Sequence, residues 1–524
     1  MLLNTLMCYR RRKTIKPSAQ SHPDCIKKLV KDCVCSILET FPPRLLNTQT
    51  GYLCDRDALI TDFDNSSECR QLLSSAAALD SSQCEEHIHE TVSAYFQYAT
   101  LSHRWGKDEP LLRDVQGRPI YQLDLTDGLI KLQSFCATAG ERGYLWSWSD
   151  TCCIDKDSTV ELAKAIASMF SWYRRSALTI VYLADVYGPG MLSSSTWFER
   201  GWTLQELLAP RAVLFYMHDW SLYKECSSSN HKKDLHVLRE LEGATGIAPQ
   251  CLTNFDPGMD NARSRFQWAS GRRTTEPEDI AYSLFGIFNV YLPIIPGESP
   301  ENALGRLLAE IITQSGDISI LSWVGVESSF HSCFPAHITA YRSELYVPSP
   351  PHVIAIQPST SSTPDLELCE GWTKLFNSLS KSGHPQFVGR RLRLPCIMHQ
   401  VTVIHLRLAD PRAPTLHVYE IHAEGLTPLK LALSHELENI SQNRPPYALI
   451  RPWHSKLLDS SPNVDSTFSE QLFMMLKQSF NALLLAETPQ NEYKRIASSS
   501  LIVACPLGDV ASIIQSKVQT VTIV

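Results

Sequence analysis

The 524-residue sequence lacks the features that mark several large classes of protein. It has no excess of basic residues, because 48 Lys and Arg stand against 55 Asp and Glu and the formal net charge is −7. Nucleic-acid binding depends on clustered positive charge, so this balance argues against a nucleic-acid-binding surface as the main function. The sequence also has no Walker motif, no G-x-G-x-x-G motif and no internal repeat.

Long hydrophobic runs are missing as well. The longest uncharged run, 280–297, contains Asn289 and two prolines, which is typical of a buried helix followed by a loop. Met1–Lys16 has a basic cluster but no apolar region after it, so we expect neither a secretory signal nor a membrane span. We therefore expect a soluble, cytoplasmic protein.

The 16 cysteines form no visible disulfide or metal framework. The closest pairs, Cys33/Cys35 and Cys152/Cys153, lack the C-x-x-C spacing of zinc and redox sites, so no metal is expected. Scattered cysteines in a chain long enough to stabilise itself by burial suit reduced thiols.

Strand-like and helical patterns alternate in the middle of the chain. Apolar runs at 97–102, 143–149, 178–184 and 212–217 alternate with helical periodicity, and Ser158-x-x-Glu161 has the pattern of a capping box. This order predicts an α/β fold with a doubly wound, mainly parallel sheet. Ser147 and Ser149 argue against a central position for the second strand, because central parallel strands are apolar on both faces.

The composition changes along the chain suggest four segments. We expect an N-terminal extension (1–90), the α/β domain (91–222), a mainly helical continuation (223–327) and a β-rich accessory domain that folds separately (328–524). The Pro- and Ser-rich stretch 348–364 has the composition of a linker. Within the accessory domain we expect strands at 391–397, 401–408, 416–421 and 500–504. We expect one helix at 468–485.

Polar residues follow the predicted strands. Ligands bind at the carboxyl ends of the strands in an open parallel sheet. We therefore expect the loops that begin at Ser102, Asp150 and Asp185 to line one cleft together with Glu206. The candidate ligand-binding residues are Ser102, His103, Arg104, Trp105, Gly106, Asp150 and Asp155. An arginine there supplies a cation, a tryptophan a stacking ring, and a glycine close backbone approach.

Each of these residues also has a purely structural interpretation. His103 could be a capping or core histidine, and Arg104 could pair with Asp150 or Asp155 merely to hold the loops together. Cys152 and Cys153 could be buried small hydrophobes rather than nucleophiles.

Trp202 and Glu206 form the most informative pair. At a spacing of four residues they share one helix face, and a carboxylate beside a large apolar ring has its pKa pushed upward. Such a group can steady charge on a bound ligand, which makes Glu206 a candidate catalytic residue and Trp202 a candidate binding residue. The alternative is a solvated glutamate on a helix whose tryptophan belongs to the core.

Three blocks resemble the fungal heterokaryon incompatibility (HET) domain. They are Tyr98-x-x-Leu101-Ser102-His103-x-Trp105-Gly106, Asp150-Thr151-Cys152-Cys153-Ile154-Asp155-Lys156 and Arg200-Gly201-Trp202-Thr203-Leu204-Gln205-Glu206-Leu207. The segment from Trp268 to Glu298 is similar to the helical continuation found in many HET proteins.

The resemblance implies a fungal protein of self/non-self recognition and programmed cell death, with a fold similar to the Toll/interleukin-1 receptor (TIR) domain. In NAD-cleaving TIR domains the glutamate at the place of Glu206 is catalytic, so the resemblance implies NAD as a substrate and no required cofactor. A carboxylate there can stabilise the oxocarbenium-like charge that develops when nicotinamide leaves ribose. The alternative is a non-enzymatic module that self-associates and recruits protein partners.

Overall fold

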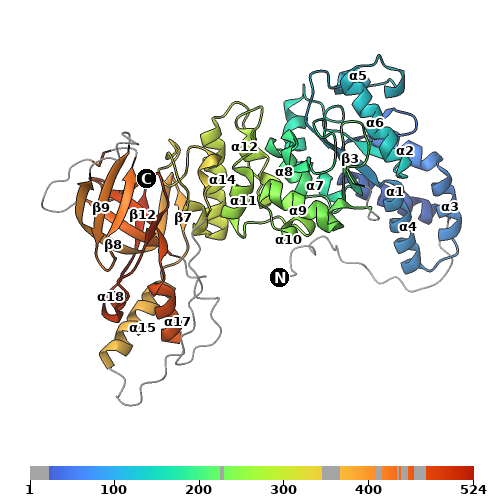
Figure 1. The fold of residues 1–524 in the computed structure, drawn as a ribbon. Helices are drawn as coiled ribbons and strands as arrows, with labels where there is room; N and C mark the ends of the chain where they lie inside the picture. Colours follow the sequence, from blue (N-terminus) through green and yellow to red (C-terminus); the bar gives the residue numbers. More distant parts are fainter. Residues whose placement is uncertain are drawn as a thin grey trace. The chain divides into compact units, whose positions relative to one another are not determined.

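A computed structural model describes residues 23–224, 229–344, 366–407, 416–433, 436–437, 446–453 and 468–524, so the stretch 348–364 lies outside the described residues. The chain is a mixed α/β protein (Figure 1). It divides into two compact units. The first unit runs to Ala165 and adds Trp172–Tyr182 and Ala212–Leu214, and the second takes the remaining residues up to Val524.

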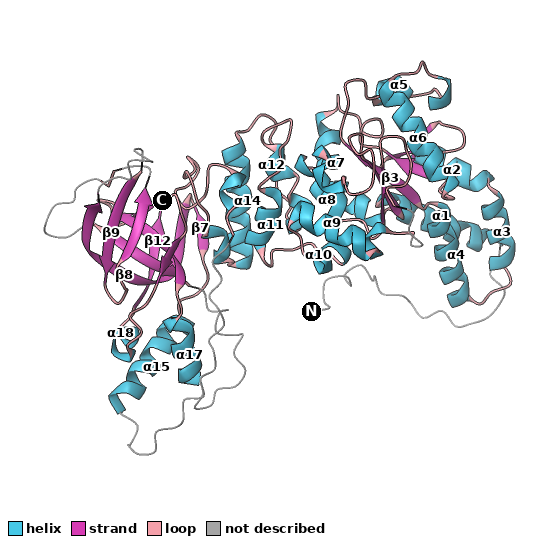
Figure 2. Ribbon diagram, viewed as in Figure 1, coloured by secondary structure: helices cyan, strands magenta, loops and turns pink. Residues whose placement is uncertain are grey.

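A six-stranded sheet forms the centre of the first unit (Figure 2). Its order is β2-β1-β4-β3-β5-β6, and β3 runs parallel to both β4 and β5. Strand β3 precedes β4 and β5 in the sequence but lies between them in the sheet. The strand order therefore reverses beside β3. The strands are β1 (Arg44–Asn47), β2 (Leu53–Asp55), β3 (Tyr98–His103), β4 (Trp146–Trp148), β5 (Leu178–Tyr182) and β6 (Val213–Tyr216).

Strand β4 lies inside the sheet, between β1 and β3, although its serine argued against that. All three residues of β4 are buried, and the Ser147 hydroxyl donates to the Leu46 carbonyl at 3.4 Å and lies 3.4 Å from the Cys136 sulfur. The expectation from alternation was wrong because a buried serine is tolerated once its hydroxyl has hydrogen-bond partners.

The N-terminal segment contributes two strands that the sequence analysis did not predict. Strand β1 pairs antiparallel with β4 and with β2, so residues from this segment extend the sheet. The turn between β1 and β2 is held by the Asn47 side chain, whose oxygen accepts from the backbone N–H groups of Gln49 and Thr50 at 3.0 Å. Gly51 completes the turn with φ +76°, a conformation that favours glycine.

The predicted capping pattern starts a helix as expected. The Ser158 hydroxyl accepts from the Glu161 N–H at 3.3 Å, and α7 follows directly. The helices of this part of the chain are α1 (Pro23–Glu39), α2 (Arg56–Asn65), α3 (Ser67–Ala76), α4 (Ser81–Tyr95), α5 (Leu112–Val115), α6 (Asp127–Glu141) and α7 (Thr159–Arg175).

The second unit begins with short helices, as the periodicity of the continuation predicts. They are α8 (Thr203–Leu208), α9 (Leu235–Thr245), α10 (Pro249–Thr253), α11 (Ala262–Ala269), α12 (Asp279–Tyr282), α13 (Phe285–Phe288) and α14 (Pro300–Ser315). In the described part of the chain, no helix combines the length and the apolar character needed to cross a bilayer.

The C-terminal part of the second unit is rich in β-strands, as expected. Strands β8, β11, β12, β13 and β15 close into a ring, because β8 pairs with both β11 and β15. The elements are α15 (Leu366–Ser380), β7 (Gln386–Val388), β8 (Arg391–Arg407), β9 (His417–Ala423), β10 (Leu429–Leu433), β11 (Tyr447–Pro452), α17 (Phe468–Lys477), β12 (Phe480–Glu487), β13 (Tyr493–Ile496), β14 (Ile502–Ala504), α18 (Val510–Ile514) and β15 (Lys517–Ile523).

Two details of this region differ from the sequence analysis. The helix expected over 468–485 ends at Lys477, and 480–487 form strand β12 between β11 and β13. A short apolar run fits a buried helix and a buried strand equally well, so its sequence could not distinguish them. The expected strands 391–397 and 401–408 are one strand, β8, with a register shift between Val401 and Val403.

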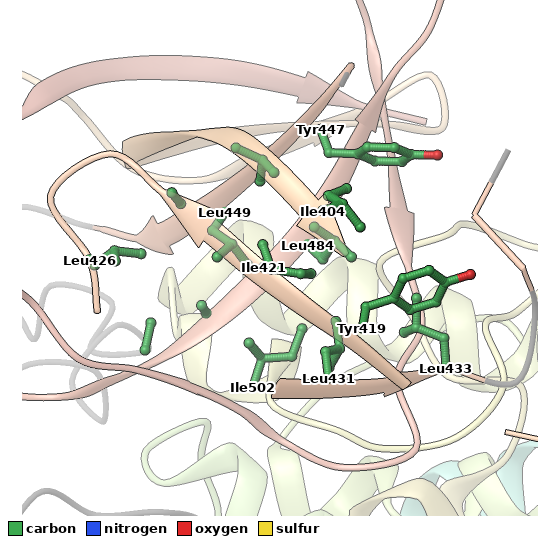
Figure 3. Close-up of a cluster of buried hydrophobic side chains, with 14 of the residues drawn as sticks. Ile404, Tyr419, Ile421, Leu426, Leu431, Leu433, Tyr447, Leu449, Leu484 and Ile502 are labelled. Carbon is green, nitrogen blue, oxygen red and sulfur yellow. The ribbon is translucent and has the colours of Figure 1, made fainter. Parts of the chain in front are cut away.

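Hydrophobic side chains fill this β-rich region in two clusters. One contains Tyr419, Ile421, Leu431, Leu449 and Leu484, which Figure 3 shows packed between the strands. The other joins Ile397 and Trp453 to side chains of α15, α17 and α18. Strand β8 thus contributes to both clusters.

Contacts also cross the expected boundary at 327/328. The buried Arg495 guanidinium donates to the carbonyls of Leu321, Trp323 and Cys333 at 2.7–3.3 Å and lies 3.8 Å from the centre of the Trp323 ring. Arg495 belongs to β13, so the β-rich region is bonded to the end of the helical continuation. The boundary itself stays a prediction.

Candidate functional site

The loops after β3 and β4 meet at Asp150. The Trp105 indole N–H donates to Oδ2 of Asp150 at 2.9 Å, and Nε2 of His103 lies 3.6 Å from Oδ1. His103 is buried and Trp105 is half-buried. Parallel pairing of β3 with β4 brings their carboxyl ends to the same edge, and this is why residues 45 positions apart come together.

Lys156 adds a positive charge to this cluster. Its Nζ lies 3.2 Å from the centre of the Trp105 ring, a cation–π contact. Lys156 also lines a cavity of about 200 Å³ together with Arg113 and Asp155. We call Trp105, Asp150 and Lys156 the Trp105 cluster. It combines an aromatic ring, a carboxylate and a cation at the edge of a parallel sheet.

Three other predicted residues shape the loop that carries Trp105. Ser102 is fully buried in β3, whereas Arg104 and Gly106 are exposed. The Gly106 N–H donates to the Glu109 carboxylate at 2.6 Å, and Glu109 also forms an ion pair with Lys131 of α6. The loop is thereby anchored to α6 by its backbone.

Asp155 lies at the start of a polar network. Its N–H donates to the Glu161 carboxylate at 2.8 Å, and its own carboxylate accepts from the Asp157 N–H at 3.0 Å. Burial alone favours the protonated form of Glu161, but hydrogen bonds from Arg44 and from the Asp155 N–H lower its pKa. This network connects the β4–α7 loop to strand β1 through Arg44. Asp155 therefore has a structural role in addition to lining the cavity.

The adjacent cysteines fit the structural interpretation. Cys152 and Cys153 are fully buried. A hydrogen bond with Cys153 and burial both raise the pKa of the Cys152 thiol, which is the opposite of what a nucleophilic thiolate needs.

Asp185, in the second unit, holds the chain that leads to the tryptophan motif. Its carboxylate accepts from the hydroxyls of Ser195 and Thr196, each at 2.6 Å, and from the Thr196 N–H at 2.8 Å. Although burial favours its protonated form, these bonds lower the pKa of Asp185. It therefore acts as an ionised anchor for residues 195–196.

Glu206 is buried rather than exposed to solvent. All six residues of α8 are buried, and the Glu206 side chain is 5% exposed. The Glu206 N–H donates to the Trp202 carbonyl at 3.4 Å, as expected for residues one helical turn apart. Trp202 itself immediately precedes α8 and is half-buried.

A buried arginine accompanies Glu206. Arg272 is 5% exposed and donates to the Arg200 carbonyl and the Thr203 hydroxyl, both at 2.9 Å. Burial lowers the pKa of Arg272 to about 9, while the negative charge of Glu206 opposes that shift. Glu206 and Arg272 thus compensate one another electrostatically in a buried place.

Asp279 is the partner of Trp202, and the sequence analysis gave it no role. The Trp202 indole N–H donates to Oδ2 of Asp279 at 2.9 Å. Burial raises the pKa of Asp279 to about 6, against the lowering effect of that hydrogen bond. Arg272 and Asp279 both belong to the block 268–298, so the signal for them was the resemblance of that block to HET proteins.

The structure thus brings together two groups of predicted residues. His103, Trp105, Asp150 and Asp155 lie in the first unit, and Trp202 and Glu206 in the second. A joint cleft that includes both groups stays a prediction. Among the described residues, no group of three or more His, Cys, Asp or Glu side chains is arranged to hold a metal ion.

The comparison with known protein families agrees with these motifs. Residues 98–188, which contain the Trp105 cluster, match the family "Heterokaryon incompatibility protein (HET)". Over 239 residues the chain is 39% identical to "Vegetative incompatibility protein HET-E-1" of Podospora anserina. Both matches support the HET family for this part of the chain.

The similarity covers parts of both proteins. It includes 43% of this chain and 17% of HET-E-1. No solved structure matches this chain.

Proposed function

We propose that this protein is an effector of heterokaryon incompatibility, causing cell death in fungal self/non-self recognition, and that its HET region cleaves NAD between nicotinamide and ribose. The family match at 98–188 and the similarity to an incompatibility protein support the biological role. The resemblance to TIR domains supports the reaction.

The proposal that this region binds NAD rests on the Trp105 cluster. Lys156 has the charge to bind a phosphate of NAD, and Asp150 has oxygens that can accept from ribose hydroxyls. The adjoining cavity of about 200 Å³ is lined by two cations, Lys156 and Arg113, and two carboxylates, Asp155 and Asp157, so it offers a polar ligand both donors and acceptors. A ring, a carboxylate and a cation at one edge of a sheet suit a nucleotide better than an apolar ligand.

In the proposed reaction water adds to the anomeric carbon of ribose as its bond to nicotinamide breaks. Nicotinamide leaves as a neutral molecule, so no general acid is needed, and one proton is released to solvent. Positive charge develops on the ribose ring in the transition state, and Glu206 is the group proposed to stabilise it.

The test is nicotinamide release from NAD by the purified full chain, measured across protein concentrations. Lys156→Gln should raise KM for NAD about tenfold, because it removes one charge-assisted contact. Lys164→Gln, which removes an exposed charge from α7 of the same HET region, is the matched control and should leave KM unchanged. Equal effects of the two substitutions would contradict binding at the Trp105 cluster.

A second candidate function is a non-enzymatic module that self-associates and recruits partners. The burial of Glu206 beside Arg272 favours it, because a compensated carboxylate in a packed core is typical of a structural residue. Light scattering on the same samples distinguishes the two candidates. Concentration-dependent assembly without any nicotinamide release would favour the module and would contradict NAD cleavage.

A further inference from the structure

A cavity in the β-rich region is lined by positively charged side chains that have no role in the proposed reaction. Its volume is about 290 Å³, and it lies between the strands and helices α17 and α18. Ile397 and His399 of β8, Arg451 of β11, Phe480 of β12 and Lys517 of β15 line it. A volume of this size is at the lower end of the range for small-molecule sites.

Arg451 is the most unusual group in the lining. Its guanidinium donates to the carbonyls of Leu476 and Met475 at 2.9 and 3.0 Å, at the end of α17, and lies 4.8 Å from the centre of the Phe480 ring. These bonds use two of the five N–H donors that a guanidinium carries. They also fix the side chain in one orientation, which prepares its remaining donors for a ligand.

Two cations, Arg451 and Lys517, line this cavity. Within the described part of the chain neither Arg451 nor Lys517 forms an ion pair with a carboxylate, although Glu424 also lines the cavity. Burial lowers the pKa of Arg451 to about 10, so the charge is held at an electrostatic cost. An anion in the cavity would remove that cost.

His399 contributes a polar ring to the same lining. Its Nδ1 lies 2.9 Å from the Glu424 carbonyl, and the ring stacks on Phe480 with centroids 5.7 Å apart. With Nδ1–H donating to that carbonyl, Nε2 is the nitrogen left for other contacts. The lining therefore offers two cations, a stacked pair of rings and apolar side chains such as Ile397.

We propose that this cavity binds a small phosphate-bearing molecule, with the phosphate held between Arg451 and Lys517 and an organic portion against His399 and Ile397. The planar donor fork of arginine matches the oxygens of a phosphate, and Lys517 adds a second charge. This site is separate from the HET region and is independent of NAD cleavage.

The experiment measures binding of inorganic phosphate and of phenyl phosphate to the full chain by calorimetry, with ionic strength held constant by NaCl. Lys517→Gln is the main variant, since Lys517 is exposed and its loss leaves the bonds of Arg451 to α17 intact. Lys430→Gln, at an exposed lysine of β10 outside the lining, is the matched control.

Saturable binding of either probe that Lys517→Gln weakens about tenfold, and Lys430→Gln leaves unchanged, is the expected result. Tighter binding of phenyl phosphate than of inorganic phosphate supports an organic portion against His399 and Ile397, and equal binding of the two probes would overturn that part of the proposal. Absence of saturable binding of both probes would overturn the proposal. Equal weakening by the two lysine variants would also overturn it, because it would reflect net charge alone.

Discussion

The indole N–H of Trp202 donates a 2.9 Å hydrogen bond to the carboxylate of Asp279, 77 residues further along the chain. This bond joins the third HET-like block to the helical continuation. Arg272 makes a parallel link, since it bonds to the Arg200 carbonyl and the Thr203 hydroxyl. The continuation is therefore part of the structure that holds Trp202 and Glu206.

Asp279→Asn should stabilise the protein at neutral pH. The pKa of Asp279 is raised to about 6, so between about pH 4 and pH 6 the folded state binds more protons than the unfolded state, and stability falls as the pH rises. Asparagine keeps an oxygen to accept from Trp202 but carries no charge. We expect a gain of about 2 kcal/mol at pH 7.5 and almost none at pH 4.

Urea titrations at both pH values check this expectation. Glu276 is an exposed acid three residues away whose charge supplies only a minor part of that shift, so Glu276→Gln is the control and should stabilise the protein at pH 7.5 much less than Asp279→Asn does. A gain of the same size at pH 4 and pH 7.5 would show that ionisation of Asp279 is not the cause.

Glu206→Gln should abolish NAD cleavage or cell death, and the structure adds that it should also destabilise the fold. Loss of transition-state stabilisation of about 3 kcal/mol corresponds to a rate decrease of about a hundredfold or more. Removing the charge also leaves Arg272 buried without compensation, at a cost of about 3 kcal/mol in the free energy of unfolding. Nicotinamide release and urea titration measure the two effects separately.

The double variant Glu206→Gln/Arg272→Met separates chemistry from packing. Removing both charges should restore part of the lost stability, because no uncompensated buried ion remains, while the bonds of Arg272 to the Arg200 carbonyl and the Thr203 hydroxyl are lost. Activity should stay absent if Glu206 acts on the substrate. Recovery of activity together with stability would assign Glu206 a purely structural role.

Acid should destabilise the contact between β15 and residues 331–333, which follow the helical continuation. Buried His331 lies 2.9 Å from the Ile523 carbonyl through Nε2, and its Nδ1 accepts from the Cys333 N–H at 3.1 Å. Burial lowers its pKa to about 4, so the unfolded state binds more protons below pH 6.5 and stability falls as the pH drops towards 4. The expected loss is about 3 kcal/mol.

His331→Gln removes this titration and should flatten the stability profile between pH 6.5 and pH 4, as followed by urea titration at several pH values. The control is His337→Gln, at an exposed histidine six residues away, which should have the same dependence of stability on pH as the unsubstituted chain. A profile that still falls with acid in His331→Gln would point to other groups.

A chain that ends at Trp323 should be less soluble than one that ends at Glu344. The Tyr341 hydroxyl donates to the Ile320 carbonyl at 2.7 Å, and its ring stacks on Phe266 with centroids 4.9 Å apart. Ending the chain at Trp323 removes this buried contact and exposes apolar surface. The soluble yield and the thermal unfolding of the two shortened chains should be compared. Equal yields and equal unfolding temperatures would show that residues 324–344 are not part of that core.

Local patterns predicted those parts of the molecule in which neighbouring residues decide the structure. The helix after Ser158 formed because a serine hydroxyl satisfies an N–H group at its start. The apolar runs at β3 and β5 became strands of a sheet, and parallel pairing brought the loop of Trp105 to that of Asp150, as the general rule for such sheets predicts.

Local patterns failed where a distant partner decides the structure. The serine of β4 is accommodated by the Leu46 carbonyl, about a hundred residues away, and the run 480–487 became a strand because two other strands flank it. Neither partner is visible from the sequence around these positions.

The residue types at the candidate sites, the spacing of Trp202 and Glu206, and the order of strands and helices in residues 98–188 can be read from the amino-acid sequence. Three features emerge only when the chain is folded: Glu206 is buried beside Arg272, Asp279 bonds to Trp202, and Arg451 and Lys517 line one cavity. The physical reason is that burial and charge compensation depend on atoms brought together from distant positions, whereas helix caps and periodicity depend on neighbours a few residues apart.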